Sequence, residues 1–176
     1  MKPRGPLMIE HRLMEKMMEI TKQKISESRK SNKVEMPFID AFVDFMTTYA
    51  DRTHHGKEED IYFRECAKKN MTNSESELLN ELLQEHELSR KTVEAIAEAQ
   101  ERYREGEEVL DVILDKLNAL VALYRQHIDK EDHRFFPESE KYFSETEQTA
   151  MLEEFREFDE KIIHQKYRSV VARWKN

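Results

Sequence analysis

The sequence predicts an all-α protein, an up-down-up-down four-helix bundle with one additional C-terminal helix. Apolar residues recur every three or four positions through most of the chain, as on one face of an α-helix. Only 3 Gly and 4 Pro occur among 176 residues, too few for the many turns of a sandwich or barrel. Short polar breaks divide the periodic segments into helices of about 20 to 30 residues.

The first two helices are expected within residues 7–69. The first should span about 7–29 and end at a polar break, Ser31–Lys33. Pro37 suits the first turn of the second helix, where its missing N–H costs no hydrogen bond. The apolar stripes are Leu7, Met8, Met14, Met18 and Ile25 in the first helix, and Phe38, Phe42, Phe45, Met46 and Tyr49 in the second.

The other helices follow two further breaks. Asn70–Ser74 offers Thr72, Asn73 and Ser74 as caps for the third helix, and Gly106 marks its end. A fourth helix should run from about 110 to Pro137, and a C-terminal helix from about 144 to 174. Their stripes include Leu78, Leu82 and Val93, then Leu117, Tyr124 and Ile128, then Met151, Phe155 and Ile162.

Composition narrows the possible functions. The formal net charge is −8 and no dense basic stripe occurs, so we expect no nucleic-acid partner. One cysteine, Cys66, excludes an internal disulfide and a thiolate zinc site. No apolar run approaches the roughly 20 residues of a membrane span, and no signal-peptide core begins the chain. We therefore expect one cytoplasmic domain over 1–176, with its bundle over about 6–137 and no membrane partner.

One sequence motif occurs twice. The stretches 54–63 and 127–136 both read His-x-x-Lys-Glu-(Glu/Asp)-x-x-aromatic-Phe. His and Glu at i and i+4 lie on one helix face, so His54 with Glu58, and His127 with Glu131, can each reach one ion. Imidazole nitrogen and carboxylate oxygen together suit iron, manganese or zinc.

Two more histidines fall at the same height in the predicted bundle. Residues at one height in an antiparallel hairpin are equidistant from its turn. The midpoints of 11 and 56, of 56 and 86, and of 86 and 129 all fall on the three predicted breaks. The sequence therefore predicts one layer of metal ligands: His11, His54, Glu58, His86, His127 and Glu131.

The second helix offers two registers. Val43, Thr47 and Ala50 lie behind His54, whereas Thr48, Asp51 and Arg52 lie behind His55. The first face is less polar, so we expect His54 and Glu58 to point inward, with His55 and Glu59 toward the edge. Burying six such groups without a compensating cation would cost many kcal/mol.

These residues resemble the hemerythrin-like (HHE cation-binding) family. The matching stretches are Ile-Glu-His11, His54-His-Gly-Lys-Glu-Glu, Leu-Leu-Gln-Glu-His86-Glu-Leu and His127-Ile-Asp-Lys-Glu-Asp-His-Arg-Phe-Phe-Pro. The resemblance implies a centre of two iron ions with an oxo or hydroxo bridge, for which zinc or manganese can substitute. It implies that Glu58 and Glu131 bridge the irons, that the four histidines are terminal ligands, and that an open position meets dioxygen, peroxide or nitric oxide.

The sequence differs from the oxygen-carrying members of that family. They have a second histidine one turn after the third-helix ligand, where this chain has Arg90. They also end in His-x-x-x-x-Asp; the repeat favours Glu131 here, with Asp132 as the alternative. Four histidines and two carboxylates resemble the bacterial and archaeal non-carrier branch, and would leave one iron more open.

We therefore expect a non-heme di-iron protein that binds dioxygen or a related small oxidant, in sensing, storage or stress defence. A di-iron oxidoreductase acting on peroxide, oxygen or nitric oxide is the first alternative. An iron storage or donor protein is the second. An interaction module with the C-terminal helix as its output element is the third.

Overall fold

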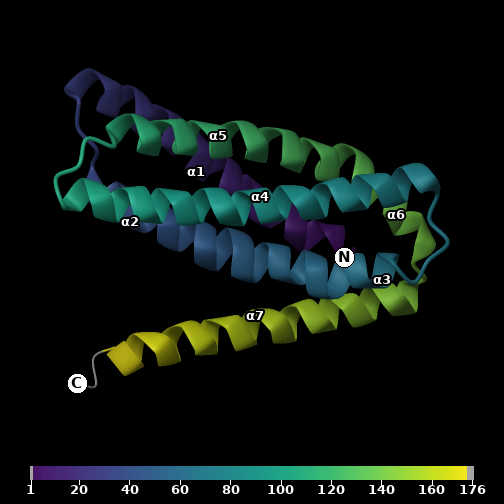
Figure 1. Cartoon of the computed structure of the whole chain (residues 1–176). Helices are drawn as coiled ribbons and strands as arrows, with labels where there is room; N and C mark the ends of the chain where they lie inside the picture. The colour runs from purple at the N-terminus through teal and green to yellow at the C-terminus, as the bar shows by residue number, and fades with distance from the viewer. Residues whose placement is uncertain (1, 174–176) are drawn as a thin grey trace.

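The fold is all-α, as predicted. A computed structural model describes residues 2–173, with the side chains described to residue 166, and no strand occurs within that range. Four long helical rods lie side by side, and a fifth helix, α7, runs along one side of them (Figure 1). The expected end of this last helix, at residue 174, lies outside the described residues.

Each rod comprises one or more helical segments. The first rod is α1 (Arg4–Ser31) and the third is α4 (Asn73–Arg104). The second rod contains α2 (Met36–Asp44), η1 (Phe45–His55), η2 (Glu58–Phe63) and α3 (Arg64–Cys66). The fourth contains α5 (Leu110–Lys130), η3 (Glu131–Phe135) and α6 (Phe136–Ser139). A short 3₁₀ turn, η4 (Glu140–Tyr142), leads to α7 (Glu145–Arg173).

The breaks between rods use the turn chemistry that the sequence predicts. Asn32 ends α1 in the left-handed conformation, with φ 52°. Thr72 and Glu75 form a reciprocal capping box at the start of α4, which satisfies two otherwise unpaired N–H groups. Gly106, at φ 92°, follows α4, where a residue without a Cβ atom turns the chain at no steric cost.

Parts of the second and fourth rods are π-helical. The segments η1, η2 and η3 are wound in this way, so each hydrogen bond spans one residue more than in an α-helix. Both copies of the repeated His-x-x-Lys-Glu motif lie where these rods change between α and π winding. The wider turns change which side chains point inward at that height.

Two apolar clusters fill the bundle on either side of this height. One contains Met14, Met18, Phe42, Met46, Val93, Leu117 and Tyr124. The other contains Leu7, Ile61, Tyr62, Leu82, Phe135 and Phe136, together with Met151 and Phe155 of α7. The polar layer between them is thus shielded from water at both ends.

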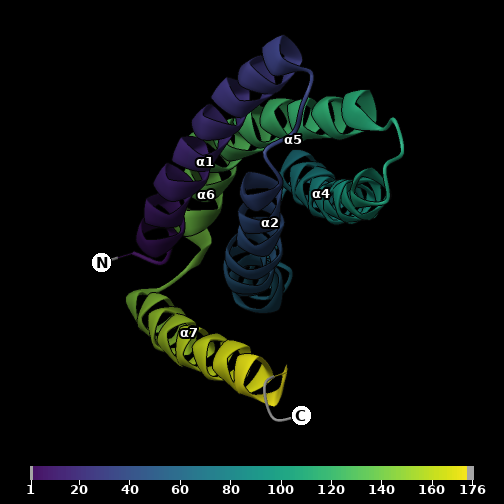
Figure 2. The same ribbon diagram turned by 90° about the vertical axis from the view of Figure 1, so that its left-hand side faces the viewer.

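The last helix packs against one rod of the bundle. Figure 2 shows α7 outside the bundle, on the side of α2 and away from α5. It packs mainly against η1 and η2. Among the described helices, none has both the length and the apolar composition needed to cross a membrane.

Candidate metal centre

Seven buried residues meet in one layer across the four rods. All six predicted ligands are there, joined by His55, and each is at most 3% exposed. They form two groups with nitrogen and oxygen atoms within 4.8 Å of one another: His11, His54, Glu58 and Glu131, then His55, His86, His127 and Glu58. We call these the first and the second group.

The two glutamates approach histidines of both groups. Glu58 lies 3.1 Å from Nε2 of His54 through Oε1 and 3.4 Å from Nε2 of His86 through Oε2. Glu131 Oε2 lies 3.1 Å from Nε2 of His11 and 3.3 Å from Nε2 of His127. Each carboxylate is therefore positioned between two sets of imidazoles, as a bridge between two ions requires.

Five of the atoms that face the middle of this layer have no hydrogen-bond partner. Both oxygens of Glu58, both of Glu131 and Nε2 of His55 are buried without a hydrogen bond. Two pairs of imidazole nitrogens also face each other, with Nε2 of His11 and His54 2.9 Å apart and Nε2 of His86 and His127 3.1 Å apart. Buried polar atoms are costly unless partnered, and a cation at each group would partner all of them. The residues therefore fit a metal centre.

A carboxylate supports the outer nitrogen of four of the imidazoles. Nδ1 of His11 donates to Asp132 at 2.7 Å, and Nδ1 of His86 to Glu59 at 2.7 Å. The other two pairs are His54 with Glu10, at 2.8 Å, and His127 with Glu85, at 2.9 Å. These bonds hold the hydrogen on Nδ1 and direct the Nε2 lone pair inward, as metal-binding histidines require.

The four supporting carboxylates form a closed ring around the bundle. Each one adjoins a predicted ligand in the sequence and supports a histidine on a neighbouring rod. The rods are linked in the order first, second, third, fourth and first again by the pairs Glu10–His54, Glu59–His86, Glu85–His127 and Asp132–His11. The sequence predicts Asp132 only as an alternative ligand and Glu59 only toward the edge, and it predicts no role for Glu10 or Glu85. The adjacency of all four to the predicted ligands was nevertheless a signal.

A basic side chain pairs with each member of the ring. Arg12 binds Asp132, Lys57 binds Glu10, Arg90 binds Glu59 and Lys130 binds Glu85. Arg90 therefore acts as a counter-ion for a carboxylate. These cations balance the charge of the supporting carboxylates and hold them in place.

The prediction that His55 lies toward the edge was wrong. His55 is 1% exposed, and its ring stacks on that of His86 with centroids 3.8 Å apart. Glu59, which was also predicted to lie toward the edge, does remain partly exposed, and it supports His86. Both His54 and His55 are buried in the interior, at the end of the π-helical segment η1. The candidate set therefore has five imidazoles, and His55 adds one where the oxygen carriers use the position of Arg90.

The structure separates the roles of Glu131 and Asp132. Glu131 belongs to the first group, whereas Asp132 supports His11 from behind. Its second oxygen pairs with Arg12. Asp132 thus faces away from the point where the donor atoms converge.

The layer sets the charge state of its own members. Burial opposes protonation of His54, but the charge of Glu58, together with the hydrogen bond to Glu10 and the charge of Glu10, raises its pKa to about 10. Burial, together with the neighbouring histidines and Arg90, holds the pKa of His55 well below its usual value. Burial would raise the pKa of Glu131, but His127, His11 and His86 hold it at about 2. Without metal, His54 is therefore protonated, and an ion must displace that proton to bind there.

The two halves of the bundle supply corresponding residues. Glu10-His11 on α1 corresponds to Glu85-His86 on α4, and the two copies of the His-x-x-Lys-Glu-(Glu/Asp) motif correspond on the second and fourth rods. The correspondence fails at His55, whose counterpart is Ile128. This single difference gives the second group three imidazoles and the first group two.

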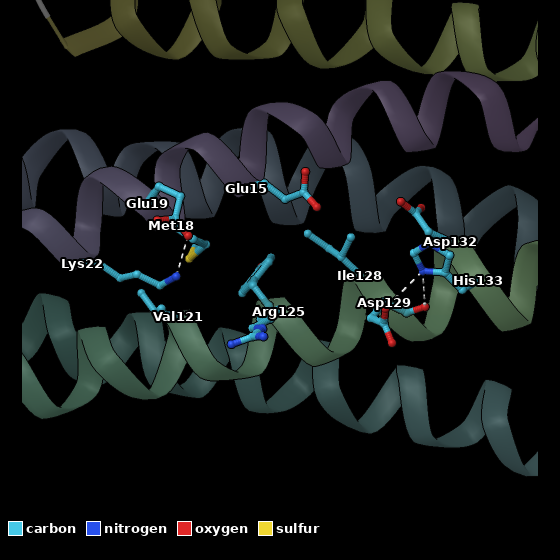
Figure 3. A pocket seen from close by; sticks show the side chains of 11 residues that line it. Glu15, Met18, Glu19, Lys22, Val121, Arg125, Ile128, Asp129, Asp132 and His133 are labelled. Atoms are coloured by element: carbon cyan, nitrogen blue, oxygen red, sulfur yellow. Dashed lines mark hydrogen bonds and ion pairs between the residues drawn. The ribbon is translucent and has the colours of Figure 1, made fainter.

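A groove between α1 and α5 approaches the layer from solvent. Its volume is about 630 Å³, and its lining combines charged side chains with the apolar ones of Met18, Val121 and Ile128 (Figure 3). Asp132 lies at one end of the groove. Solvent thus comes within one hydrogen bond of His11, while the layer itself stays enclosed.

Comparisons with known proteins gave one match. A family model described as "Hemerythrin HHE cation binding domain" matches residues 6–139, which include all seven residues of the layer. Nothing matches among the curated proteins, and nothing matches among the solved structures.

Proposed function

Because this chain belongs to the hemerythrin HHE cation-binding family, we propose that it is a non-heme di-iron protein that binds dioxygen or a related small oxidant, in sensing, storage or stress defence. One observation carries the proposal. Five imidazoles and two carboxylates form two adjacent groups that share Glu58. Imidazole and carboxylate together are a donor set that suits iron.

Each donor group would supply the ligands of one ion. His11 and His54, with Glu58 and Glu131, would hold one iron. His55, His86 and His127, with Glu58, would hold the other, and Glu131 also lies within reach of it. The first group has fewer imidazoles, so its ion has more positions left for an outside ligand. Iron in such a site supplies a redox-active centre that can bind a small oxidant.

The protein around the ions restricts water and fixes the ligands. Apolar clusters close both ends of the layer, and carboxylates hold four of the five imidazoles. An enclosed site with rigid ligands favours retention of iron over its donation to another protein. Small oxidants can approach through the groove between α1 and α5.

Metal content and the ultraviolet–visible spectrum of anaerobically reduced protein test the proposal. We expect about two irons per chain, one for each donor group, and a near-ultraviolet absorption that appears when air is admitted. A further band that disappears when oxygen is removed would support reversible binding. Sustained consumption of oxidant would instead indicate an oxidoreductase. Protein that holds no iron after expression with added iron would refute the di-iron proposal.

A matched pair of histidine variants controls for non-specific binding. His54→Ala should lose most of the iron of the first group. His133→Ala should lose none, because the side chain of His133 is 74% exposed and pairs with Asp129 on the surface. Equal iron content in the two variants would contradict the assignment.

A further inference from the structure

A fully buried lysine lies beside the layer. Lys57 is 0% exposed, and its Nζ pairs with Glu10 of α1 and with Asp159 of α7, the latter at 2.8 Å. Burial of an ammonium group is costly unless it is paired and hydrogen-bonded. Two carboxylates from two different helices meet that requirement here.

The same carboxylate links Lys57 to a metal ligand. Glu10 binds Lys57 through Oε1 and accepts a hydrogen bond from Nδ1 of His54, at 2.8 Å, through Oε2. Three consecutive contacts therefore join Asp159 of α7 to an imidazole of the first group.

The third and fourth rods contain a lysine that corresponds to Lys57 but needs no contact with α7. Lys130 corresponds to Lys57 and pairs with Glu85 and Glu81, both on α4. Glu81 precedes Glu85 by four residues, and the residue four before Glu10 is Pro6. The bundle thus supplies both carboxylates in one half and only one in the other, where α7 supplies the second.

The packing of α7 brings it close at this point. A Cβ atom on Gly56 would lie 2.6 Å from Cζ of Phe158. Gly56 and Phe158 directly precede Lys57 and Asp159 in the sequence. The missing side chain of Gly56 therefore lets α7 approach closely where Asp159 meets Lys57.

We propose that Asp159 is a positioning residue of the metal centre, which supports His54 through Lys57 and Glu10. The inference rests on the proposed metal-binding function. Residues that support metal ligands from outside tune the affinity of the ion, and a coupling between two sites acts equally in both directions. Docking of α7 therefore tightens the first group, and an ion in that group strengthens the docking of α7.

Zinc release from the full-length protein tests this coupling. Protein loaded with zinc alone is mixed with a chromophoric chelator, and the two ions are followed as separate kinetic phases. Loss of a directly supporting residue typically weakens metal affinity 10- to 100-fold, so we expect Asp159→Asn, one contact further out, to accelerate one phase about 3- to 10-fold. Asp159→Glu keeps the charge and should keep release slow.

A control variant separates this role from general docking of α7. Glu154 of α7 pairs with Arg64 at 2.8 Å, and both side chains are more than 40% exposed. Glu154→Gln should leave both zinc phases unchanged. Equal acceleration by Glu154→Gln and Asp159→Asn would overturn the role of Asp159, as would wild-type release from Asp159→Asn.

Two further measurements test the path and the reciprocal effect. In a double-mutant cycle, Asp159→Asn should add little to Glu10→Gln, because both act through one contact chain. Zinc should slow hydrogen exchange in residues 150–163 of the wild type and do so less in Asp159→Asn. Additive effects, or equal protection in both proteins, would overturn the inference. A wild type that takes up no zinc or cobalt would refute metal binding itself, whereas two tightly held ions with no effect of Asp159 would refute only the inference.

Discussion

The replacement of His55 by alanine distinguishes the structure from the sequence prediction. The α-helical register predicts that His55→Ala retains its metal. The structure places Nε2 of His55 in the second group, buried and without a hydrogen bond, so the variant keeps two of three imidazoles there. We expect about one tightly bound metal ion per chain where the wild type holds about two.

The size of the effect follows from that lost donor. Loss of a supporting residue weakens metal affinity about 10- to 100-fold, so loss of a direct ligand should cost at least about 100-fold. Each factor of ten is about 1.4 kcal/mol, so a 100-fold loss corresponds to about 2.8 kcal/mol. At about 2–4 °C per kcal/mol for a chain of this size, the rise in melting temperature on adding zinc should be about 5–10 °C smaller than in the wild type.

The assay compares melting with zinc and with a chelator for each variant. The difference between the two melting temperatures cancels any packing loss that the substitution causes in the metal-free protein. His54→Ala should show a loss of similar size, and His133→Ala should match the wild type. A full complement of two ions in His55→Ala, with an unchanged zinc effect, would refute its role as a ligand.

Three other predictions concern the carboxylates, the pH dependence and the packing of α7. Glu58→Gln should lose both ions, because both groups share this residue, whereas Asp132→Asn should weaken metal binding only about 10- to 100-fold. Metal analysis after dialysis distinguishes the two variants. Similar metal losses in both would contradict the different roles of Glu58 and Asp132. The pKa of His54 is raised to about 10 from 6.5. The stability that protonated His54 contributes to the metal-free protein is therefore fully present below pH 6.5 and is lost as the pH rises toward 10. Urea unfolding of the metal-free protein should show this fall in the free energy of unfolding, and the zinc-loaded protein should not. Gly56→Ala should destabilise the protein by about 1 kcal/mol, because a steric contact with Phe158 costing about 1–3 kcal/mol outweighs the roughly 1 kcal/mol gain in helix propensity. In a Phe158→Ala background, where that contact is absent, the same change should stabilise the protein. Stabilisation in both backgrounds would contradict the close approach of α7.

The height of the ligand layer could be predicted from the sequence alone. Helices have a nearly constant rise per residue, so residues equidistant from a turn lie side by side in an antiparallel pair. The breaks around Asn32, Thr72 and Gly106 could be recognised from their turn chemistry. His11, His54, His86 and His127 lie in one layer for that reason.

The inward faces were less predictable, because they depend on winding as well as height. An α-helical wheel separates His54 from His55 by about 100°, or one residue in 3.6 per turn. Both histidines are nevertheless buried, on the π-helical segment η1, and nothing in the local sequence indicates this winding. The placement of His55 therefore needed the structure.

The supporting contacts could not be predicted from spacing along one helix. Glu10 adjoins His11 but supports His54, and Glu85 adjoins His86 but supports His127. Such pairs depend on which rods are neighbours and on their rotation. The burial of Lys57 likewise depends on the position of α7, since its sequence surroundings are typical of a solvent-exposed helix face.

The division of each donor group between the two halves of the chain has a consequence for biosynthesis. The first group takes His11, His54 and Glu58 from the first two rods but needs Glu131 from the fourth, and the second group takes His86 and His127 from the later rods. A ribosome that has delivered only the first seventy residues has therefore delivered neither group complete. Neither group is complete until the second hairpin has emerged, and a truncated product of the first hairpin would lack His86, His127 and Glu131.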